Sequence, residues 1–314
     1  MLVEQAIFAS AQTASASGYQ LLGASPGISA AERRELAQWC PTHDSLWSST
    51  RGPRSVNFFR LASGAYCVST SSAAPAEYSG RGGTHVQTHC CLVPPALLAK
   101  FSNNPFALLR AVTARTSDQI EPGSADLPTF HLAGSAALID MSSLSQLVVS
   151  GGAAIVSRLV DAVLSGNRTL VRGATDPELL ASGVISCLPL PARLELSFST
   201  GLFPSQRRPF RMVWAPPGNR ARSGEAMVVD LNEPPTSLGQ PNGWAGFVLD
   251  ALSVNNLSRL SAELKQLPLS LADDALFAKG EAARQRIAIG EGPRRISDPI
   301  YRNLSHKGTD VVTS

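Results

Sequence analysis

The apolar residues of this chain are gathered into many short runs, and this distribution limits which folds it can adopt. No run approaches the roughly 18–20 uninterrupted apolar residues that a membrane helix needs. The best candidate, Ala153 to Leu164, is interrupted by Ser157, Arg158 and Asp161. The 25 Gly and 22 Pro residues favour turns between the runs. Short strands and helices joined by many turns are therefore expected, with no membrane-spanning segment.

The composition indicates a folded protein with a large core. Hydrophobic residues make up 44% of the chain and charged residues 16%, which is far from the composition of disordered proteins. A length of 314 residues favours two domains. The five cysteines are odd in number and form no C-x-x-C motif, so reduced and mostly buried thiols are expected. Glu4 stands where a secretory signal would carry a basic residue, and we predict a cytoplasmic location.

Residues 1–140 predict an α+β domain with a largely antiparallel sheet. Ser29 and Glu32 form a capping box, which indicates a helix that continues to about Cys40. Ser63 and Gly64 separate two apolar runs in the manner of a hairpin turn. Strands are expected at Leu2–Ala9, Tyr19–Ala24, Asn57–Leu61, Tyr66–Thr70 and Thr84–Val93, and short helices from Pro95 and through Phe106.

Residues 141–270 alternate between helices and strands, which predicts a smaller α/β layer domain. Gly166 is suited to end a helix, and the sequence from Thr175 to Glu178 offers a helix cap followed by proline in the first turn. Helices are expected at Ala153–Leu164, from Thr175 to about Cys187 and at Val254–Gln266, and strands at Thr169–Val171, Leu194–Ser199, Phe210–Trp214 and Ala226–Leu231.

Residues 271–314 are predicted to be a basic, partly flexible C-terminal tail. From Lys279 onward the chain has seven basic and four acidic residues, so this stretch holds the whole net charge of +3. Such a small surplus indicates a solvated tail and argues against nucleic-acid binding.

Gly23-Ala24-Ser25-Pro26-Gly27 matches the G-x-S-x-G nucleophile elbow of hydrolases. In such elbows the residue after the serine supplies a backbone N–H to the oxyanion hole, and Pro26 has none. A strand-to-helix turn is the preferred interpretation, with Ser25 and Gly27 as candidate binding residues. A hydrolase that uses Ser25 remains the alternative.

The segment from Arg81 to Cys91 has the most suggestive chemistry in the chain. Alternation along a strand places His85, His89 and Cys91 on one face, where they would be candidate zinc ligands. No acidic ligand or second Cys/His cluster accompanies them, so no metal is predicted. Arg81, Gly82 and Gly83 offer a guanidinium and open backbone amides, which makes them, with His89, candidate contacts for an anion or a peptide. A metal-dependent enzyme at His85, His89 and Cys91 is the second form of the enzymatic alternative.

Motifs for nucleotide cofactors are absent from the sequence. It has neither G-x-x-x-x-G-K-[ST] nor a G-x-G-x-x-G after a strand, which argues against a P-loop GTPase or a dinucleotide enzyme. No cofactor is predicted.

Two groups of segments resemble a known family. The first comprises Tyr19-Gln-Leu-Leu-Gly-Ala-Ser-Pro-Gly27, Phe59-Arg-Leu61 and Ser79-Gly-Arg-Gly-Gly83 leading to His89. It is similar to the N-terminal domain of bacterial GTPase-associated proteins. The second, Leu188 to Thr200 with the preceding strand from Asn167 to Val171, resembles their middle domain. Together these resemblances span roughly residues 1–250.

The resemblance implies a regulator or adaptor that is encoded beside a GTPase in bacterial conflict systems. The function predicted is therefore that of a non-enzymatic, cytoplasmic protein whose partner is another protein, a GTPase, and not a membrane or a nucleic acid.

Overall fold

The computed structural model describes residues 1–13, 16–49, 52–74, 82–115, 126–166, 168–216, 226–232, 241–267 and 273–289. Its centre is one mixed sheet of 11 strands among these residues, with the order β11-β8-β10-β9-β4-β5-β6-β1-β2; β3 pairs with β4, and β7 with β1. The strands are β1 (Leu2–Gln12), β2 (Ser17–Ala24), β3 (Ser48–Ser49), β4 (Gly52–Arg60), β5 (Tyr66–Ala73), β6 (Val86–Val93), β7 (Phe130–His131), β8 (Thr169–Arg172), β9 (Phe198–Ser199), β10 (Met212–Ala215) and β11 (Met227–Asp230).

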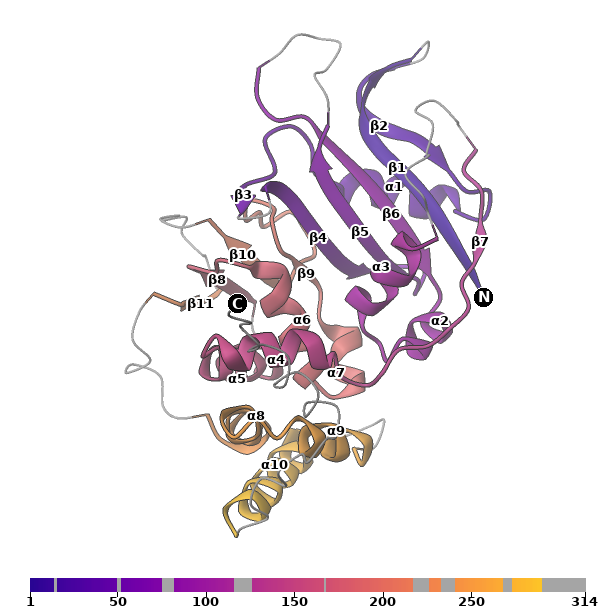
Figure 1. Cartoon of the computed structure of the whole chain (residues 1–314). Helices are drawn as coiled ribbons and strands as arrows, with labels where there is room; N and C mark the ends of the chain where they lie inside the picture. The colour runs from indigo at the N-terminus through magenta and orange to yellow at the C-terminus, as the bar shows by residue number, and fades with distance from the viewer. Residues whose placement is uncertain are drawn as a thin grey trace, which may run out of the picture.

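Ten helices surround the sheet in the described part of the chain. They are α1 (Ala30–Trp39), α2 (Pro95–Lys100), α3 (Pro105–Thr113), α4 (Met141–Val149), α5 (Ala153–Leu164), α6 (Pro177–Cys187), α7 (Leu190–Glu195), α8 (Gly243–Ser253), α9 (Leu257–Lys265) and α10 (Asp273–Ala288). In Figure 1, α1 lies behind the sheet, α3 lies in front of it, and α8, α9 and α10 gather at the end of the molecule away from β2. None of the described helices is long and apolar enough to cross a membrane.

The two parts of the sheet differ in strand direction. All pairings among β1, β2, β4, β5 and β6 are antiparallel. By contrast, β8, β9, β10 and β11 pair with one another in parallel. The single antiparallel pairing of β4 with β9 joins the two parts. The predicted fold class is confirmed as α+β with a mixed sheet, and the N-terminal part is largely antiparallel.

Side-chain alternation along the strands divides the core between the two faces of the sheet. On β6, Cys91 belongs to the cluster that includes α3, whereas Cys90 and Leu92 belong to the cluster that includes Leu36 of α1.

The predicted capping box starts α1: the Ser29 hydroxyl accepts from the Glu32 amide at 3.2 Å, and the Glu32 carboxylate accepts from the Ser29 amide at 2.9 Å. A local sequence signal therefore determines where this helix begins, and buried Leu36 packs it against the sheet.

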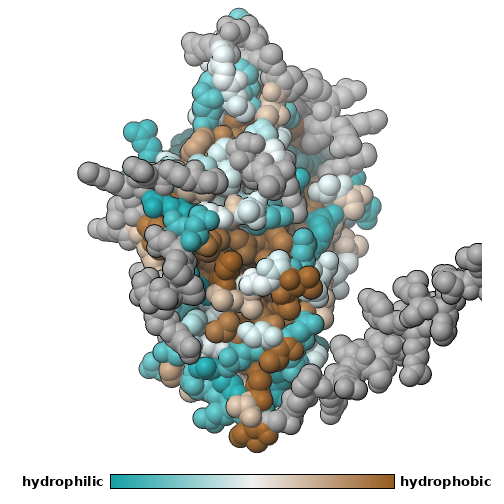
Figure 2. Space-filling view, turned by 60° about the vertical axis from the view of Figure 1, so that its left-hand side comes forward, coloured by the Kyte–Doolittle hydropathy of each residue, from teal (hydrophilic) through white to brown (hydrophobic). Residues whose placement is uncertain are grey.

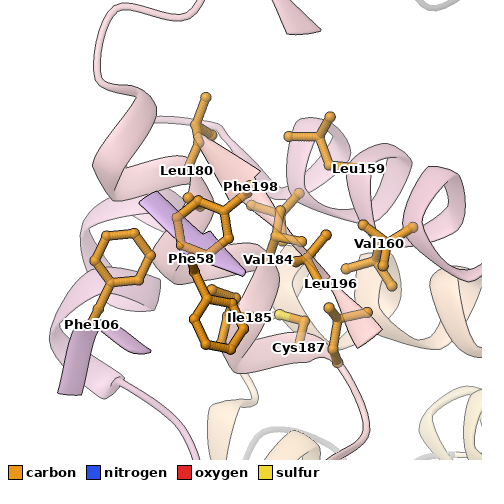
Figure 3. Packing of buried hydrophobic residues seen from close by; sticks show 14 of the residues in the cluster. Phe58, Phe106, Leu159, Val160, Leu180, Val184, Ile185, Cys187, Leu196 and Phe198 are labelled. Carbon is orange, nitrogen blue, oxygen red and sulfur yellow. The ribbon is translucent and has the colours of Figure 1, made fainter. Parts of the chain in front are cut away.

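The larger cluster continues without a break from the antiparallel strands to the second part of the chain. Figure 3 shows side chains of β4, β9, α3, α5 and α6 gathered in it. The Phe198 ring is central, with its centroid 5.9 Å from that of Phe58, 5.4 Å from that of Phe106 and 6.4 Å from that of Trp214. Because the sheet and this cluster both cross residue 140, the division into domains at residues 1–140 and 141–270 stays a prediction.

The strand predicted at Leu194–Ser199 is wrong over its first half. Residues Leu190–Glu195 form α7, and only Phe198–Ser199 are in a strand. Pro189 and Pro191 suit a helix N-terminus, and Ala192 to Glu195 favour helix, but an apolar run this short does not distinguish helix from strand. The helix predicted from Val254 begins at Leu257 instead, because Asn255 is left-handed (φ 51°) and Asn256 is the N-cap.

Four helices were not predicted from the sequence: α4, α7, α8 and α10. The last of these occupies part of the region predicted to be a tail, and residues 290–314 of that region lie outside the described residues. Charged residues are spread along α10 from Asp273 to Arg286, so it lacks a clear apolar stripe, and Gly280 lowers its intrinsic helix propensity. Packing against α8 stabilises α10 as a helix, and a contact between distant segments cannot be predicted from a local sequence pattern.

Candidate functional site

Ser25 lies at the end of β2 and is completely buried. Its hydroxyl accepts from the Gln5 backbone N–H at 2.8 Å and donates to the Pro128 carbonyl at 3.4 Å. The Gln5 carbonyl accepts from the Ser25 amide at 2.8 Å. These bonds tie the end of β2 to β1, so the hydroxyl is used by the fold. Its burial gives it no access to a substrate or partner, and among the described residues it donates to a backbone carbonyl and to no histidine.

Gln5 connects Ser25 to His89. The Gln5 amide nitrogen donates to the Pro128 carbonyl at 2.7 Å, and this bond fixes the orientation of the side-chain amide. Its oxygen then lies 2.9 Å from His89 Nε2, which must donate because that oxygen can only accept. Burial lowers the pKa of His89. The result is a neutral, partly buried hydrogen-bonded cluster between β1 and β6, and no sequence motif identifies Gln5.

The three candidate metal ligands are only partly brought together. Cys91 Sγ lies 4.0 Å from His89 Nε2, and burial raises the pKa of the Cys91 thiol. His85 lies instead against His43, with the ring centroids 5.0 Å apart. Among the described residues there is no group of three His, Cys, Asp or Glu side chains that could hold a metal ion.

Gly82 and Gly83 form an exposed turn before β6. Gly83 has a left-handed φ of 103°, and a Cβ there would come within 2.5 Å of the His43 ring. The Thr84 amide donates to the Asp44 carboxylate at 2.8 Å. Both glycines are accessible, as a peptide contact would require, whereas Arg81 lies outside the described residues.

The five cysteines are free and buried in this fold, as predicted. Cys40 and Cys90 lie on the α1 side of the sheet with their sulfurs 3.6 Å apart. The contact with Cys90 and burial raise the pKa of Cys40, and burial raises that of Cys67. These thiols act as apolar core side chains.

Gly27 lines a surface groove of about 430 Å³ between β1, the β2–α1 connection and the start of α2. Its walls are mainly apolar and include Met1 and Leu2, each 45% exposed. Two carboxylates, Glu4 and Glu32, also line it. Gly27, one of the binding residues predicted from the sequence, therefore lies in a groove. Glu4 was not predicted, because a single acidic residue in a strand gives no signal.

Apolar side chains also reach the surface on another side of the molecule. The side that carries β8, β10 and β11 is turned forward in Figure 2, and the middle of this face is brown. Val228 of β11 is 36% exposed. β11 is an edge strand of the sheet in the described part of the chain.

Comparison with known proteins identifies the N-terminal part. Residues 2–131 match the family model of GTPase-associated protein 1, N-terminal domain type 2. No curated protein matches the chain. The family resemblance predicted from Tyr19 to His89 is thereby confirmed over residues 2–131, which hold β1 to β7 and α1 to α3. The resemblance of Leu188 to Thr200 to a middle domain stays a prediction.

Proposed function

We propose that this protein binds a GTPase as a non-enzymatic adaptor or regulator, in the cytoplasm, within a bacterial conflict or signalling system. One observation carries the proposal: residues 2–131 match a domain whose family is described as GTPase-associated. Association with a GTPase is what that description suggests, and the adaptor role goes beyond it.

The chemistry of the candidate site supports binding over catalysis. The Ser25 hydroxyl is buried and bonded to the backbone, and His89 donates to an amide oxygen. Neither is arranged as a nucleophile with its base. By contrast, the groove at Gly27 and the apolar surface in Figure 2 are accessible, which is what an interface requires.

Co-purification of the full chain with the GTPase encoded nearest to its gene tests this function. The tagged GTPase is loaded with GDP or with a non-hydrolysable GTP analogue, mixed with the chain and passed over a size-exclusion column. We expect the two proteins to elute together in at least one of the two nucleotide states. An unrelated GTPase of similar size is the control, and it should elute separately.

Two results would contradict the proposal. Separate elution in both nucleotide states would remove the GTPase as partner. Hydrolysis of GTP by the chain alone, without the GTPase, would contradict its non-enzymatic character.

A further inference from the structure

The groove at Gly27 contains a carboxylate with one oxygen that accepts no hydrogen bond from the described residues. Glu4 projects from β1 over the backbone of Gly27, where a Cβ would lie too close to its carboxylate. Its Oε2 is buried, and no described residue donates a hydrogen bond to it. Because Glu4 lines the groove and its side chain is only partly buried, a cation in the groove can form an ion pair with its carboxylate.

The second carboxylate of the groove, Glu32, differs from Glu4 in having hydrogen-bond donors for both of its oxygens. Glu32 accepts from the Ser29 amide at 2.9 Å through one oxygen and from the Ser63 hydroxyl at 2.7 Å through the other. Both of its oxygens are therefore used by the helix cap and a neighbouring turn. Glu4 alone of the two is available to a ligand.

The walls around Glu4 are apolar. Ile28, Leu92, Val93, Pro94 and Ala96 line the groove together with Met1 and Leu2. Its volume of about 430 Å³ lies within the range of roughly 300–1,000 Å³ that is typical of ligand pockets. A long basic side chain fits such a site, since its methylene groups lie on apolar walls while its charged end reaches the carboxylate.

We propose that this groove receives a basic side chain, flanked by apolar residues, from a segment of the protein partner, with Glu4 as the residue that binds the charge. The inference rests on the proposed function, because the partner is taken to be the GTPase. The complementary charge of Glu4 selects a basic segment, and the accessible Met1 and Leu2 select its apolar neighbours.

A short peptide tests the site without the GTPase. The probe is acetyl-Leu-Leu-Arg-Leu-Leu-amide, and the matched peptide carries neutral citrulline in place of arginine. We expect the arginine peptide to bind the full chain and to shift the NMR signals of Leu92, Val93 and Ala96. The citrulline peptide should bind at least tenfold more weakly. Equal affinity for the two peptides would overturn the role of Glu4.

Variants of the chain locate the binding. Glu4→Gln removes the charge and should lower the affinity for the arginine peptide at least tenfold. Ala96→Trp leaves Glu4 intact but should block the groove and so prevent the peptide from binding. Glu195→Gln is the matched control, because this exposed carboxylate lines a different pocket, and it should bind like wild type. Glu4→Gln should keep or raise the melting temperature, since Glu4 Oε2 accepts no hydrogen bond from the described residues. Unchanged binding in Glu4→Gln and Ala96→Trp would overturn the site.

The GTPase experiment separates the two proposals. Loss of GTPase binding in Glu4→Gln, with Glu195→Gln unaffected, supports both. A GTPase that binds wild type and Glu4→Gln equally overturns the groove as its docking site and leaves the proposed function standing. Peptide binding that depends on Glu4, without any GTPase binding, means that the proposed function fails while the groove serves another protein. Self-association of the chain that Glu4→Gln abolishes would assign the groove to a second copy instead.

Discussion

Arg193 shows how much of this fold depends on a single side chain. It is completely buried, and its guanidinium donates to the carbonyls of Leu188, Ser102, Leu138 and Ser186 at 2.8–3.1 Å. Burial lowers its pKa to about 10, so the group stays charged at neutral pH. Carbonyl dipoles offset the cost of burying that charge, and the same bonds hold the α2–α3 turn and the end of α6 together.

His89 should make the protein sensitive to acid. Burial places the pKa of His89 below its ordinary value of about 6.5, so below that pH the unfolded chain binds more protons than the folded one. Its contribution is complete above about pH 6.5 and is lost as the pH falls toward the folded pKa. We expect His89→Gln, which can still donate to Gln5, to lose less stability than wild type between pH 7 and pH 5 in urea denaturation.

The control for this prediction is His131→Gln, because the His131 side chain is exposed. That variant should lose as much stability on acidification as wild type. If acidification from pH 7 to pH 5 lowered the free energy of unfolding by the same amount in wild type and in His89→Gln, the prediction would be contradicted.

At the scale of elements, α10 depends on close contact with α8. Gly280 of α10 lies against the backbone of Gly243, where a Cβ would come within 2.1 Å of the Gly243 carbonyl carbon. The Glu281 carboxylate accepts from the Gly243 amide at 2.6 Å, and Arg284 forms an ion pair with Asp250 at 2.8 Å. Glycine at 280 is therefore required by packing, although it costs helix propensity.

Gly280→Ala should loosen α10. Alanine gains about 1 kcal/mol of helix propensity, but its methyl group would overlap backbone that cannot move aside as a flexible side chain can. We expect faster hydrogen exchange in the amides of α10 and an unchanged rate in β1, β4, β5 and β6. Lys279→Ala, at an exposed position of the same helix, should leave α10 protected. Slower exchange of the α10 amides in Gly280→Ala would contradict the prediction. It would mean that the gain in helix propensity outweighs the steric overlap with the Gly243 backbone.

At the scale of the whole molecule, one sheet and one large cluster join the N-terminal part to the rest. The antiparallel strands continue through β4 and β9 into the parallel ones, and the Phe198 ring lies between side chains from both parts. The two parts therefore share one buried cluster, and we expect them to unfold cooperatively.

Phe198→Ala should therefore lower the stability of the entire chain. Removing a buried phenylalanine costs about 3–5 kcal/mol, and the shared core predicts one transition that shifts as a unit. Within each protein, circular dichroism and tryptophan fluorescence should give the same urea midpoint. The midpoint of the variant should lie below that of wild type. Phe203→Ala, a half-exposed position, serves as the control with little change. Two separate transitions, with only one moved by Phe198→Ala, would contradict a single cooperative unit.

Local signals account for the elements that the sequence predicted well. The Ser29–Glu32 box, the Ser63-Gly64 turn and the Pro177 start of α6 each act over a few residues, and each element forms where its signal stands. The candidate site was predicted less well. Gly27 does lie in a groove, but Ser25 is buried, and Glu4 and Gln5 give no local pattern at all.

Local sequence patterns were enough to predict the α+β class, most of the strands and the family of the N-terminal segment, because apolar periodicity, caps and motifs act over a few residues. Three contacts of the folded chain could not be predicted from such patterns: β4 pairs with β9, α10 packs on α8, and the Glu4 carboxylate lies over Gly27. These contacts join residues far apart in the chain. Their free energy depends on which groups fold into the same place, and no short stretch of sequence contains that information.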